Sequence, residues 1–332
     1  MPKQTFDVSD LSNLAVFDTA VGSENLGDQI IMDAVERELH ALFPRARLSH
    51  FPTHQELSSS TLKKGKQNDL GILGGTNIIR NRWYRRARKN QWRVSPQQFS
   101  ILPDIVTLGV GCNNYQDNPS GYTRRCYQTL LNNGRLHSVR DNYTLEYLQE
   151  AGVKNVINTA CPTFWTLTSQ HCSQLPTAKA KEVVFTLTDY RQDLEADKLM
   201  LQQLMDSYDH LHFWPQGPGD EGYLQQILNP HQHQKLSILA PRLDAYDELL
   251  DSDASVDFVG TRLHAGCRAM QKGRRALIIG VDNRAKEKQT NFNIPVLERQ
   301  HIGQLQQKLA SDIEIRINLP EQEIARWKQQ FL

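Results

Sequence analysis

Short apolar runs that end in glycine or a polar turn alternate along the chain with stretches of helical periodicity. The first apolar run covers residues 14–17, and glycine and polar residues at 22–28 follow it. Apolar residues then recur every three or four positions through 31–42, which places them on one face of a helix. Asp28 is a residue type that caps helix N-termini. The pattern predicts a strand, a glycine loop and an amphipathic helix capped by Asp28.

The same alternation continues through both halves of the chain. The stretch 168–181, TSQHCSQLPTAKAK, has no clear period and predicts a linker. We therefore expect an α/β protein with mostly parallel sheets, in which domains at 1–167 and 182–319 are followed by a helix at 320–332. Strands are expected at 14–17, 70–73, 105–109, 136–139, 156–158, 183–187, 211–214, 236–239, 256–259 and 276–279, and further helices at 143–151, 196–207, 221–228, 245–252 and 264–271.

Composition excludes several classes of protein. The 332 residues include 38 basic and 37 acidic side chains, so the net charge of +1 gives no overall attraction for nucleic acid. Five cysteines without CxxC spacing predict reduced thiols rather than a disulfide framework or a zinc site. The N-terminus has no apolar core of a signal peptide, and no apolar run is long enough to span a bilayer. We expect a cytoplasmic protein without a bound metal.

The loops that follow the first two strands are candidate ligand sites, because parallel α/β sheets bind ligands at the carboxyl ends of their strands. Asn25, Gly27 and Asp28 precede the first helix. A glycine loop before a helix N-terminus can cradle an anion, although turn and capping roles explain the same residues. Neither loop has the glycine pattern of a dinucleotide or P-loop site. The second loop, beside another expected helix start, consists of Gly74, Gly75, Thr76 and Asn77.

Two arginines and a histidine lie near the ends of later strands. Arg140 follows the strand at 136–139, where it could bind an anion, pair with Asp141 or belong to a helix cap. Arg262 and His264 stand on either side of Leu263, between a strand with a short Gly/Thr loop and a helix of small residues. An arginine clamps a carboxylate or phosphate with two hydrogen bonds, and a histidine moves a proton near neutral pH. This segment is the strongest candidate for catalysis.

Residues 80–93 interleave seven basic side chains with Trp83, Tyr84 and Trp92, and no acidic residue occurs in 70–103. Such a stretch fits single-stranded nucleic acid, an acidic or phosphorylated sugar, or a solvated helix face. The net charge of the whole chain weighs against nucleic acid. The candidate binding cations of this stretch are Arg85, Arg86 and Arg88.

Several blocks of the sequence resemble the polysaccharide pyruvyl transferase family. Asn-x-Gly-Asp near the N-terminus and Arg-Leu-His-Ala near residue 262 form the most specific pair, and the match runs through most of the chain in order. The matching blocks are NLGDQIIMDAV (25–35), LGILGGTN (70–77), LGVG (108–111), SVRDNYTLEYLQEAG (138–152), CPTFW (161–165), HFWPQGPGDEGY (212–223) and DFVGTRLHAGCRAM (257–270).

The resemblance implies a GT-B-like architecture, in which two Rossmann-like domains face each other across a cleft. It also implies transfer of pyruvate, as a ketal, from phosphoenolpyruvate to a sugar of an exopolysaccharide or cell-surface glycan. Arg262, Leu263 and His264 match the block associated with donor binding and catalysis. Phosphoenolpyruvate carries a carboxylate and a phosphate, so a second arginine, Arg140 or Arg191, is expected to help bind it.

The proton chemistry needs a general acid and a general base. His264 is expected to take one of these roles, and Asp28, Asp141 or Asp189 the other. No cofactor is implied beyond phosphoenolpyruvate as co-substrate. The acceptor, a sugar or lipid-linked oligosaccharide, is expected on the N-terminal domain. The residues expected to line the cleft and bind it are Asn25, Gly27, Gly74, Gly75, Thr76, Asn77, Arg85, Arg86 and Arg88.

A lipid-linked acceptor would bring the protein to the inner face of a membrane. The alternatives are a GT-B glycosyltransferase that uses a nucleotide sugar and a non-catalytic protein that binds anionic glycan or nucleic acid. Of these partners, nucleic acid is not expected.

Overall fold

The computed structural model describes residues 11–112, 114–229 and 234–332, and the chain divides into two compact units. The first unit comprises residues 1–23, 31–162 and 320–332, and the second comprises 24–30 and 163–319. The helix α1 (Leu26–Leu42) therefore begins in the second unit and continues in the first. The polar stretch 168–181, expected as a linker, is part of the second unit and contains the short helix α5 (Ser169–Cys172).

The first unit contains a parallel sheet whose strands lie in the order β2-β1-β3-β4. The chain passes from β1 outward to β2 and then returns to the other side of β1, so the winding direction reverses between β1 and β3. The carboxyl ends of strands beside such a reversal are the usual ligand position. The strands are β1 (Asn13–Asp18), β2 (Arg47–Pro52), β3 (Leu70–Gly74) and β4 (Ile105–Leu108), with β5 (His137–Val139) and β6 (Val156–Asn158) paired in a separate two-stranded sheet.

The helices of the first unit differ from the expectation at two of the predicted helix starts. The helix α1 begins at Leu26, so Asp28 lies in its first turn and is not the cap; the Asn25 side chain instead accepts from the Gly27 N–H at 3.1 Å. No α-helix follows Gly75 in the described chain until α3, and short 3₁₀ turns take its place. The remaining helices of this unit are α2 (Ser59–Gly65), α3 (Gly121–Leu131), α4 (Asn142–Glu150) and α12 (Glu321–Gln329), and the 3₁₀ turns are η2 (Ala87–Lys89) and η3 (Pro96–Ile101).

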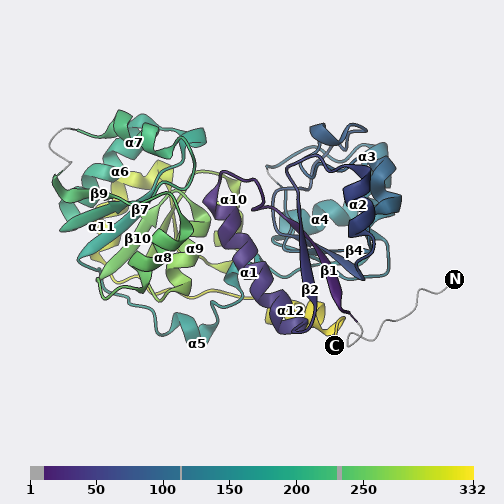
Figure 1. Cartoon of the computed structure of the whole chain (residues 1–332). Helices are drawn as coiled ribbons and strands as arrows, with labels where there is room; N and C mark the ends of the chain where they lie inside the picture. The colour runs from purple at the N-terminus through teal and green to yellow at the C-terminus, as the bar shows by residue number, and fades with distance from the viewer. Residues whose placement is uncertain (1–10, 113, 230–233) are drawn as a thin grey trace. The chain divides into compact units, whose positions relative to one another are not determined.

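The second unit is built on a six-stranded, all-parallel sheet in the order β12-β11-β10-β7-β8-β9, and Figure 1 shows its strands side by side. This is the order of a doubly wound Rossmann-like sheet, with the reversal between β7 and β10. Residue Gly260 at the end of β10 lies beside Thr186 at the end of β7. The strands are β7 (Glu182–Thr186), β8 (His210–Phe213), β9 (Leu236–Ile238), β10 (Val256–Gly260), β11 (Ala276–Gly280) and β12 (Val296–Glu298).

Helices connect these strands, and α9 packs against β10 and β11 while α6 packs against β8. No helix in the described part of the chain is both long enough and apolar enough to cross a membrane. The helices are α6 (Leu194–Ser207), α7 (Asp220–Ile227), α8 (Leu243–Asp251), α9 (Leu263–Gln271), α10 (Asn283–Phe292) and α11 (Leu305–Ala310). The 3₁₀ turns are η5 (Asp189–Arg191) and η7 (Arg299–Gln304) in the second unit, and η4 (Pro162–Phe164), whose residues are divided between the two units.

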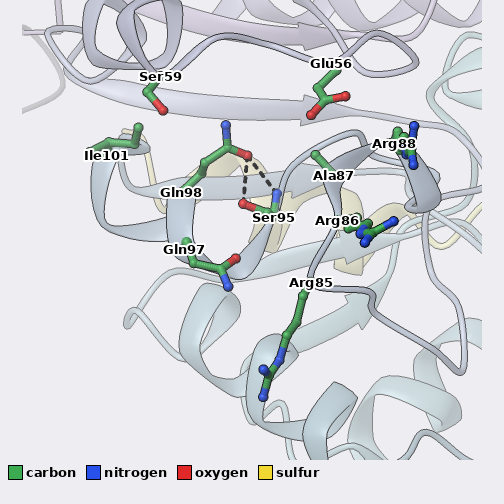
Figure 2. Close-up of a pocket in the computed structure, with 10 residues that line it drawn as sticks. All are labelled: Glu56, Ser59, Arg85, Arg86, Ala87, Arg88, Ser95, Gln97, Gln98 and Ile101. Atoms are coloured by element: carbon green, nitrogen blue, oxygen red, sulfur yellow. Dashed lines mark hydrogen bonds between the residues drawn. The ribbon is translucent and has the colours of Figure 1, made fainter.

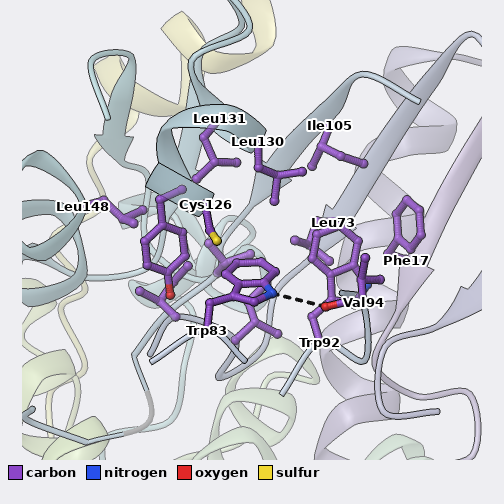
Figure 3. Close-up of a cluster of buried hydrophobic side chains, with 14 of the residues drawn as sticks. Phe17, Leu73, Trp83, Trp92, Val94, Ile105, Cys126, Leu130, Leu131 and Leu148 are labelled. Atoms are coloured by element: carbon purple, nitrogen blue, oxygen red, sulfur yellow. Dashed lines mark hydrogen bonds between the residues drawn. The ribbon is translucent and has the colours of Figure 1, made fainter. Parts of the chain in front are cut away.

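The two tryptophans of the basic stretch belong to the core of the first unit (Figure 3). Trp83 is 9% exposed and Trp92 is 2% exposed. The Trp83 indole N–H donates to the Val94 carbonyl at 3.2 Å. Its ring packs edge-on against Phe99 and Tyr127. The interpretation that aromatic rings of this stretch stack on a ligand is therefore wrong for Trp83 and Trp92, because other side chains cover them, whereas the Tyr84 ring is exposed.

Replacing Trp83 with alanine should lower the stability of the protein rather than weaken a ligand contact. Loss of a buried tryptophan leaves a cavity and costs about 3–5 kcal/mol of unfolding free energy. Urea denaturation of the Trp83→Ala protein measures that loss. Tyr84, the next residue, is 38% exposed, so Tyr84→Ala is the matched control and should change stability little. Equal losses for the two variants would contradict the buried role of Trp83.

Candidate functional site

The carboxyl ends of β7 and β10 bring together the Arg262 segment and three buried threonines. The backbone N–H of Arg262 donates to the Thr186 hydroxyl at 3.2 Å, and the hydroxyls of Thr188 and Thr261 lie 2.8 Å apart. All three threonines are at most 5% exposed. Arg262 is thereby held where the winding of the second sheet reverses, at the edge where doubly wound sheets bind ligands.

The guanidinium of Arg262 is buried and connects the loops that follow β7 and β8. Its Nε donates to the Leu187 carbonyl at 2.8 Å, and its Nη2 donates to Asp189 at 3.1 Å and to Asp220. The Tyr190 ring lies 5.0 Å from the guanidinium carbon. Burial raises the pKa of the Asp220 carboxyl, while Arg262 acts in the opposite direction. In this arrangement Arg262 orders the site as well as supplying charge to it.

His264 and Leu263 form the first turn of α9. His264 is 9% exposed and Leu263 is half-buried. The first turn contains no acidic residue, and Arg262 at the N-cap position makes no side-chain cap. The partial positive charge of the helix N-terminus therefore lies beside an imidazole. That combination can bind an anionic group and exchange a proton with it.

The residues before and at the start of α1 belong to this same unit. The Leu26 N–H donates to the Gln216 carbonyl at 3.0 Å, and the Gln216 side chain donates to Asn25 at 2.9 Å. A Cβ on Gly27 would lie 2.7 Å from the Gln216 amide nitrogen, so glycine permits this close approach. Asn25, Gly27 and Asp28 thus share a unit with Arg262, although the sequence placed Asn25 and Gly27 with acceptor binding.

Gln216 and Asp220 were not among the predicted site residues. Both lie after β8, in the Pro-Gln-Gly-Pro-Gly-Asp loop and at its junction with α7. Asp220 is 0% exposed, and its Oδ2 accepts from the backbone N–H groups of Gln216 and Gly217 at 3.1 and 2.8 Å. The glycine-rich loop at the end of β8 was the sequence feature that could have indicated them. Nothing in the local sequence showed that Asp220 pairs with Arg262.

Arg191, the alternative donor clamp, is exposed in the same unit. It ends the turn η5, and its backbone carbonyl accepts from the Arg299 guanidinium at 2.7 Å. Its neighbour Asp189 is the partner of Arg262. The exposed side chain of Arg191 is therefore free to contact an anion from solvent, whereas the buried guanidinium of Arg262 is fixed by the Leu187 carbonyl and by its two aspartates.

Arg140 lies in the first unit, where its side chain is 4% exposed. Its Nη2 donates to the Asn77 side chain at 2.6 Å and to the Cys112 carbonyl at 2.7 Å, and its Nε lies 3.4 Å from Asp141. Asp141 also caps α4, because it accepts from the Thr144 N–H at 2.9 Å. The salt bridge and the cap that the sequence left open are both present.

The Gly74–Asn77 segment surrounds the carboxyl end of β3. Gly74, Gly75 and Thr76 are buried, and Asn77 is half-buried against Arg140. A Cβ on Gly75 would lie 2.9 Å from the Gly109 carbonyl oxygen, so the close approach of two loops requires glycine. The segment is therefore a mostly buried loop at the carboxyl end of the sheet, where the winding reverses between β1 and β3.

His54 is a candidate in the first unit that sequence reasoning missed. It follows β2, and its Nε2 lies 2.9 Å from the Thr19 hydroxyl after β1. Its Nδ1 lies 3.3 Å from the Gln91 carbonyl. The strand β2 was not predicted, because it lies at the sheet edge, where only one of its six residues is buried, and forms no apolar run. Without that strand, His54 could not be placed at the carboxyl end of the sheet.

The basic stretch displays its arginines around a pocket of about 560 Å³ in the first unit. We call it the arginine pocket; Arg85, Arg86 and Arg88 line it together with Glu56, Ser95 and Gln98, among others. In Figure 2, Arg86 and Arg88 lie on the opposite side from Ser59 and Ile101, and Arg85 points away from Glu56. The Arg85 guanidinium lies 5.9 Å from the centre of the Tyr122 ring. The three predicted acceptor cations therefore share one pocket.

One group in the described chain has the composition of a metal site: Asp18 at the end of β1, Glu36 in α1 and His50 in β2. Their candidate ligand atoms lie within 4.8 Å of one another. Nδ1 of His50 is 2.7 Å from Asp18 and 3.9 Å from Glu36. Two carboxylates and an imidazole suit a transition-metal ion. The sequence showed no such set because the three residues are far apart along the chain.

Comparison with solved structures identifies the fold. The structure of S. aureus MnaA with UDP has a TM-score of 0.52 and 11% identity, over 97% of this chain and 97% of that one. UDP-N-acetylglucosamine 2-epimerase from Rickettsia bellii has a TM-score of 0.52 and 11% identity, over 96% of this chain and 94% of that one. At such identities the likeness concerns the fold alone. The GT-B-like fold with two Rossmann-like domains that the sequence predicted is confirmed.

Comparison of sequences gives a family. The family model described as polysaccharide pyruvyl transferase matches residues 25–283. The match begins at Asn25 and includes Arg262, Leu263 and His264. No curated protein matches the chain significantly.

The His50–Asp18 contact should make stability depend on pH. The hydrogen bond to Asp18 raises the pKa of His50 above its ordinary 6.5. A raised folded-state pKa contributes stability below 6.5 that is lost as the pH rises through the raised value. Asp18→Asn should therefore destabilise the protein more at about pH 5.5 than at about pH 9.

Urea denaturation at both pH values checks this, with an NMR titration of His50 in the same variant. His50→Gln is the matched control, because it should remove most of the pH dependence of the Asp18→Asn effect. An Asp18→Asn loss of stability that is equal at both pH values would show that the charged pair contributes nothing.

Proposed function

The chain belongs to the polysaccharide pyruvyl transferase family and is therefore a transferase, and on that premise we propose that it moves pyruvate from phosphoenolpyruvate to a sugar. The acceptor sugar would belong to an exopolysaccharide or cell-surface glycan unit and would receive the pyruvate as a ketal. The observation that carries the proposal is the position of the family-matched Arg262–His264 segment at the reversal of the second sheet. A lipid-linked acceptor would bring the enzyme to the cytoplasmic face of a membrane.

The donor is proposed to bind at the carboxyl edge of the second unit. The N-terminus of α9 attracts one of its two anionic groups, and Leu263 and His264 lie in that first turn. Arg262 holds the loops after β7 and β8 in place through Asp189 and Asp220. Its own charge is balanced by these acids, so exposed Arg191 is the cation of this unit that supplies additional positive charge.

The chemistry consists of two additions at one carbon. A general acid protonates the methylene carbon of phosphoenolpyruvate, which leaves positive character on the carbon that carries the phosphate. A sugar hydroxyl adds there, the bond to the phosphate oxygen breaks, and phosphate leaves with its electron pair. A second hydroxyl adds to the same carbon and closes the ketal. One hydroxyl proton replaces the one given to the methylene carbon, and the other leaves with the phosphate.

His264 is proposed as one of the two proton-transfer groups. Asp28 and Asp189 lie in the same unit and are the candidates for the other. Asp189 already accepts a hydrogen bond from Arg262, whereas Asp28 lies in the first turn of α1 and is half-buried. Asp141 is committed to capping α4 and pairing with Arg140, which makes it the weaker candidate.

The acceptor is proposed to bind the first unit at the arginine pocket. Arg85, Arg86 and Arg88 line that pocket, together with serine and glutamine side chains that can bind hydroxyl groups. The loop after β3 that contains Gly75, Thr76 and Asn77 belongs to the same unit.

Phosphate release from phosphoenolpyruvate, measured against a panel of nitrophenyl and lipid-linked sugars, tests the proposal. We expect release that depends on an acceptor, together with a rise in Tm on adding phosphoenolpyruvate. Stabilisation by nucleotide sugars, without phosphate release from phosphoenolpyruvate, would instead support the glycosyltransferase alternative.

His264→Ala should lower kcat by about 10²- to 10⁴-fold, the usual effect of losing a general acid or base. Steady-state phosphate release measures kcat, and thermal unfolding of the same preparation measures stability. His171, which is half-buried in the same unit and bonded to the Met270 carbonyl, is the control position. Near-normal kcat with a lower Tm in His264→Ala would show that His264 only orders the loop.

Arg262→Ala should destabilise the second unit strongly, because it leaves the buried Asp220 without its counter-ion. Breaking such a pair from one side costs about 3–5 kcal/mol. Arg262→Lys keeps the charge but loses the planar fork, so it should fold better and still turn over poorly. Chemical denaturation and kcat, measured together, check both variants. Wild-type activity in Arg262→Lys would show that the planar guanidinium group is not required at this position.

A further inference from the structure

The arginine pocket carries positive charge that the protein itself does not balance. Glu56 is the one acid among its lining residues, against Arg85, Arg86 and Arg88. Within the described chain, the structure records no hydrogen bond or ion pair for the guanidinium groups of Arg86 and Arg88, and both side chains are exposed. Like charges held close together repel each other, so an anion between them is stabilised.

The backbone that carries these arginines is anchored on both sides. The Asn90 side chain accepts from the Tyr84 N–H at 2.7 Å and donates to the Tyr84 and Val94 carbonyls at 2.9 Å each. The Trp83 N–H donates to the Thr123 hydroxyl at 2.9 Å, and Ala87 is 5% exposed. The arginines therefore project from a fixed loop, which lowers the entropy lost when a ligand binds.

The chemistry of the lining selects among anions. A guanidinium presents a planar fork that matches a phosphate or carboxylate, and several forks around one space favour a group with many acceptor oxygens. Single-stranded nucleic acid needs several aromatic faces for base stacking, and two of the three rings of the basic stretch, Trp83 and Trp92, are buried. Ser59, Ser95 and Gln97 add neutral hydrogen-bonding groups to the lining. These observations favour a phosphate group attached to a polar molecule.

We propose that the arginine pocket recognises a phosphate group, and that Arg86 and Arg88 are its main ligands. The phosphate would be either the diphosphate that links an acceptor sugar to a lipid or the headgroup of an anionic lipid. That this molecule is the acceptor rests on the proposed function, but binding of phosphate to the pocket does not. The enzyme would thus recognise the acceptor by its charge in the first unit.

Isothermal titration of the full chain with inorganic pyrophosphate tests the pocket directly. Arg86→Gln/Arg88→Gln should raise the Kd at least about tenfold, because each arginine makes charge-assisted hydrogen bonds. The control is Arg45→Gln/Arg47→Gln, which removes two exposed arginines from the same unit outside the pocket. The control should keep the wild-type Kd and also corrects for the change in net charge. Raising the salt concentration should weaken wild-type binding more than binding to the pocket variant.

Two further probes distinguish the sources of the phosphate. Farnesyl diphosphate, added below its micelle concentration, represents a lipid-linked diphosphate. Phosphatidylglycerol vesicles, compared with phosphatidylcholine vesicles, represent an anionic membrane. Pocket-dependent binding of the first identifies the carrier diphosphate, and pocket-dependent sedimentation with the second identifies the headgroup.

Equal pyrophosphate affinity in the wild type and the pocket variant would overturn the proposal, as would an equal loss of affinity in the control variant. These outcomes do not depend on catalysis. If the pocket variant loses pyrophosphate binding while phosphoenolpyruvate supports no turnover, the phosphate site stands and the proposed reaction fails. If turnover is normal in both variants with a lipid-linked acceptor, the reaction stands and the role of the pocket fails.

Discussion

The pairing of Arg262 with Asp189 and Asp220 is the interaction on which the second unit's site depends. Asp220 is 0% exposed and the Arg262 side chain is 3% exposed, so neither charge is solvated by water and each requires the other. Their contact ties the loops after β7 and β8 to the start of α9. A Cβ on Gly217 would lie 2.5 Å from the Arg262 Nη2, so the loop must carry glycine there for the contact to form. The position of His264 follows from this fixed loop cluster.

The first unit also has a buried arginine that connects loops, Arg140 at the end of β5. Arg140 is buried beside Gly111, where a Cβ would lie 2.1 Å from the arginine Nε. Its guanidinium binds the Asn77 side chain and the Cys112 carbonyl, and thereby joins the loops after β3 and β4. In both units a buried arginine at a strand end orders the surrounding loops. An arginine in a family-matched block can therefore be necessary for activity without contacting substrate, because it sets the geometry of the groups that do.

The sequence predicted most buried strands because parallel strands covered on both faces form continuous apolar runs. The strands β3, β4 and β10, which are buried throughout, were found in this way. The strand β2 was missed because it lies at the sheet edge, where only one of its six residues is buried, and it forms no continuous apolar run. The helix α3 was missed as well, although its buried residues recur with helical spacing. Continuous apolar runs therefore identify strands that are buried throughout, whereas an edge strand such as β2 forms no such run.

The site was harder to predict than the fold because its contacts join distant parts of the chain. Asn25 and Gln216 are 191 positions apart, and no local feature of either loop indicates the other.

In the basic stretch, residues that are close in sequence lie on different sides of the loop, which the sequence did not show. Its rings and cations suggested one binding surface, but Trp83 and Trp92 turn inward to the core while Arg86 and Arg88 remain outside. The buried rings give the loop its rigidity, and the exposed arginines give it charge. A stretch that resembles a stacking surface for nucleic acid therefore presents mainly positive charge, because two of its three rings lie in the core. The function of such a stretch can therefore be inferred only when it is known which of its side chains are buried in the core.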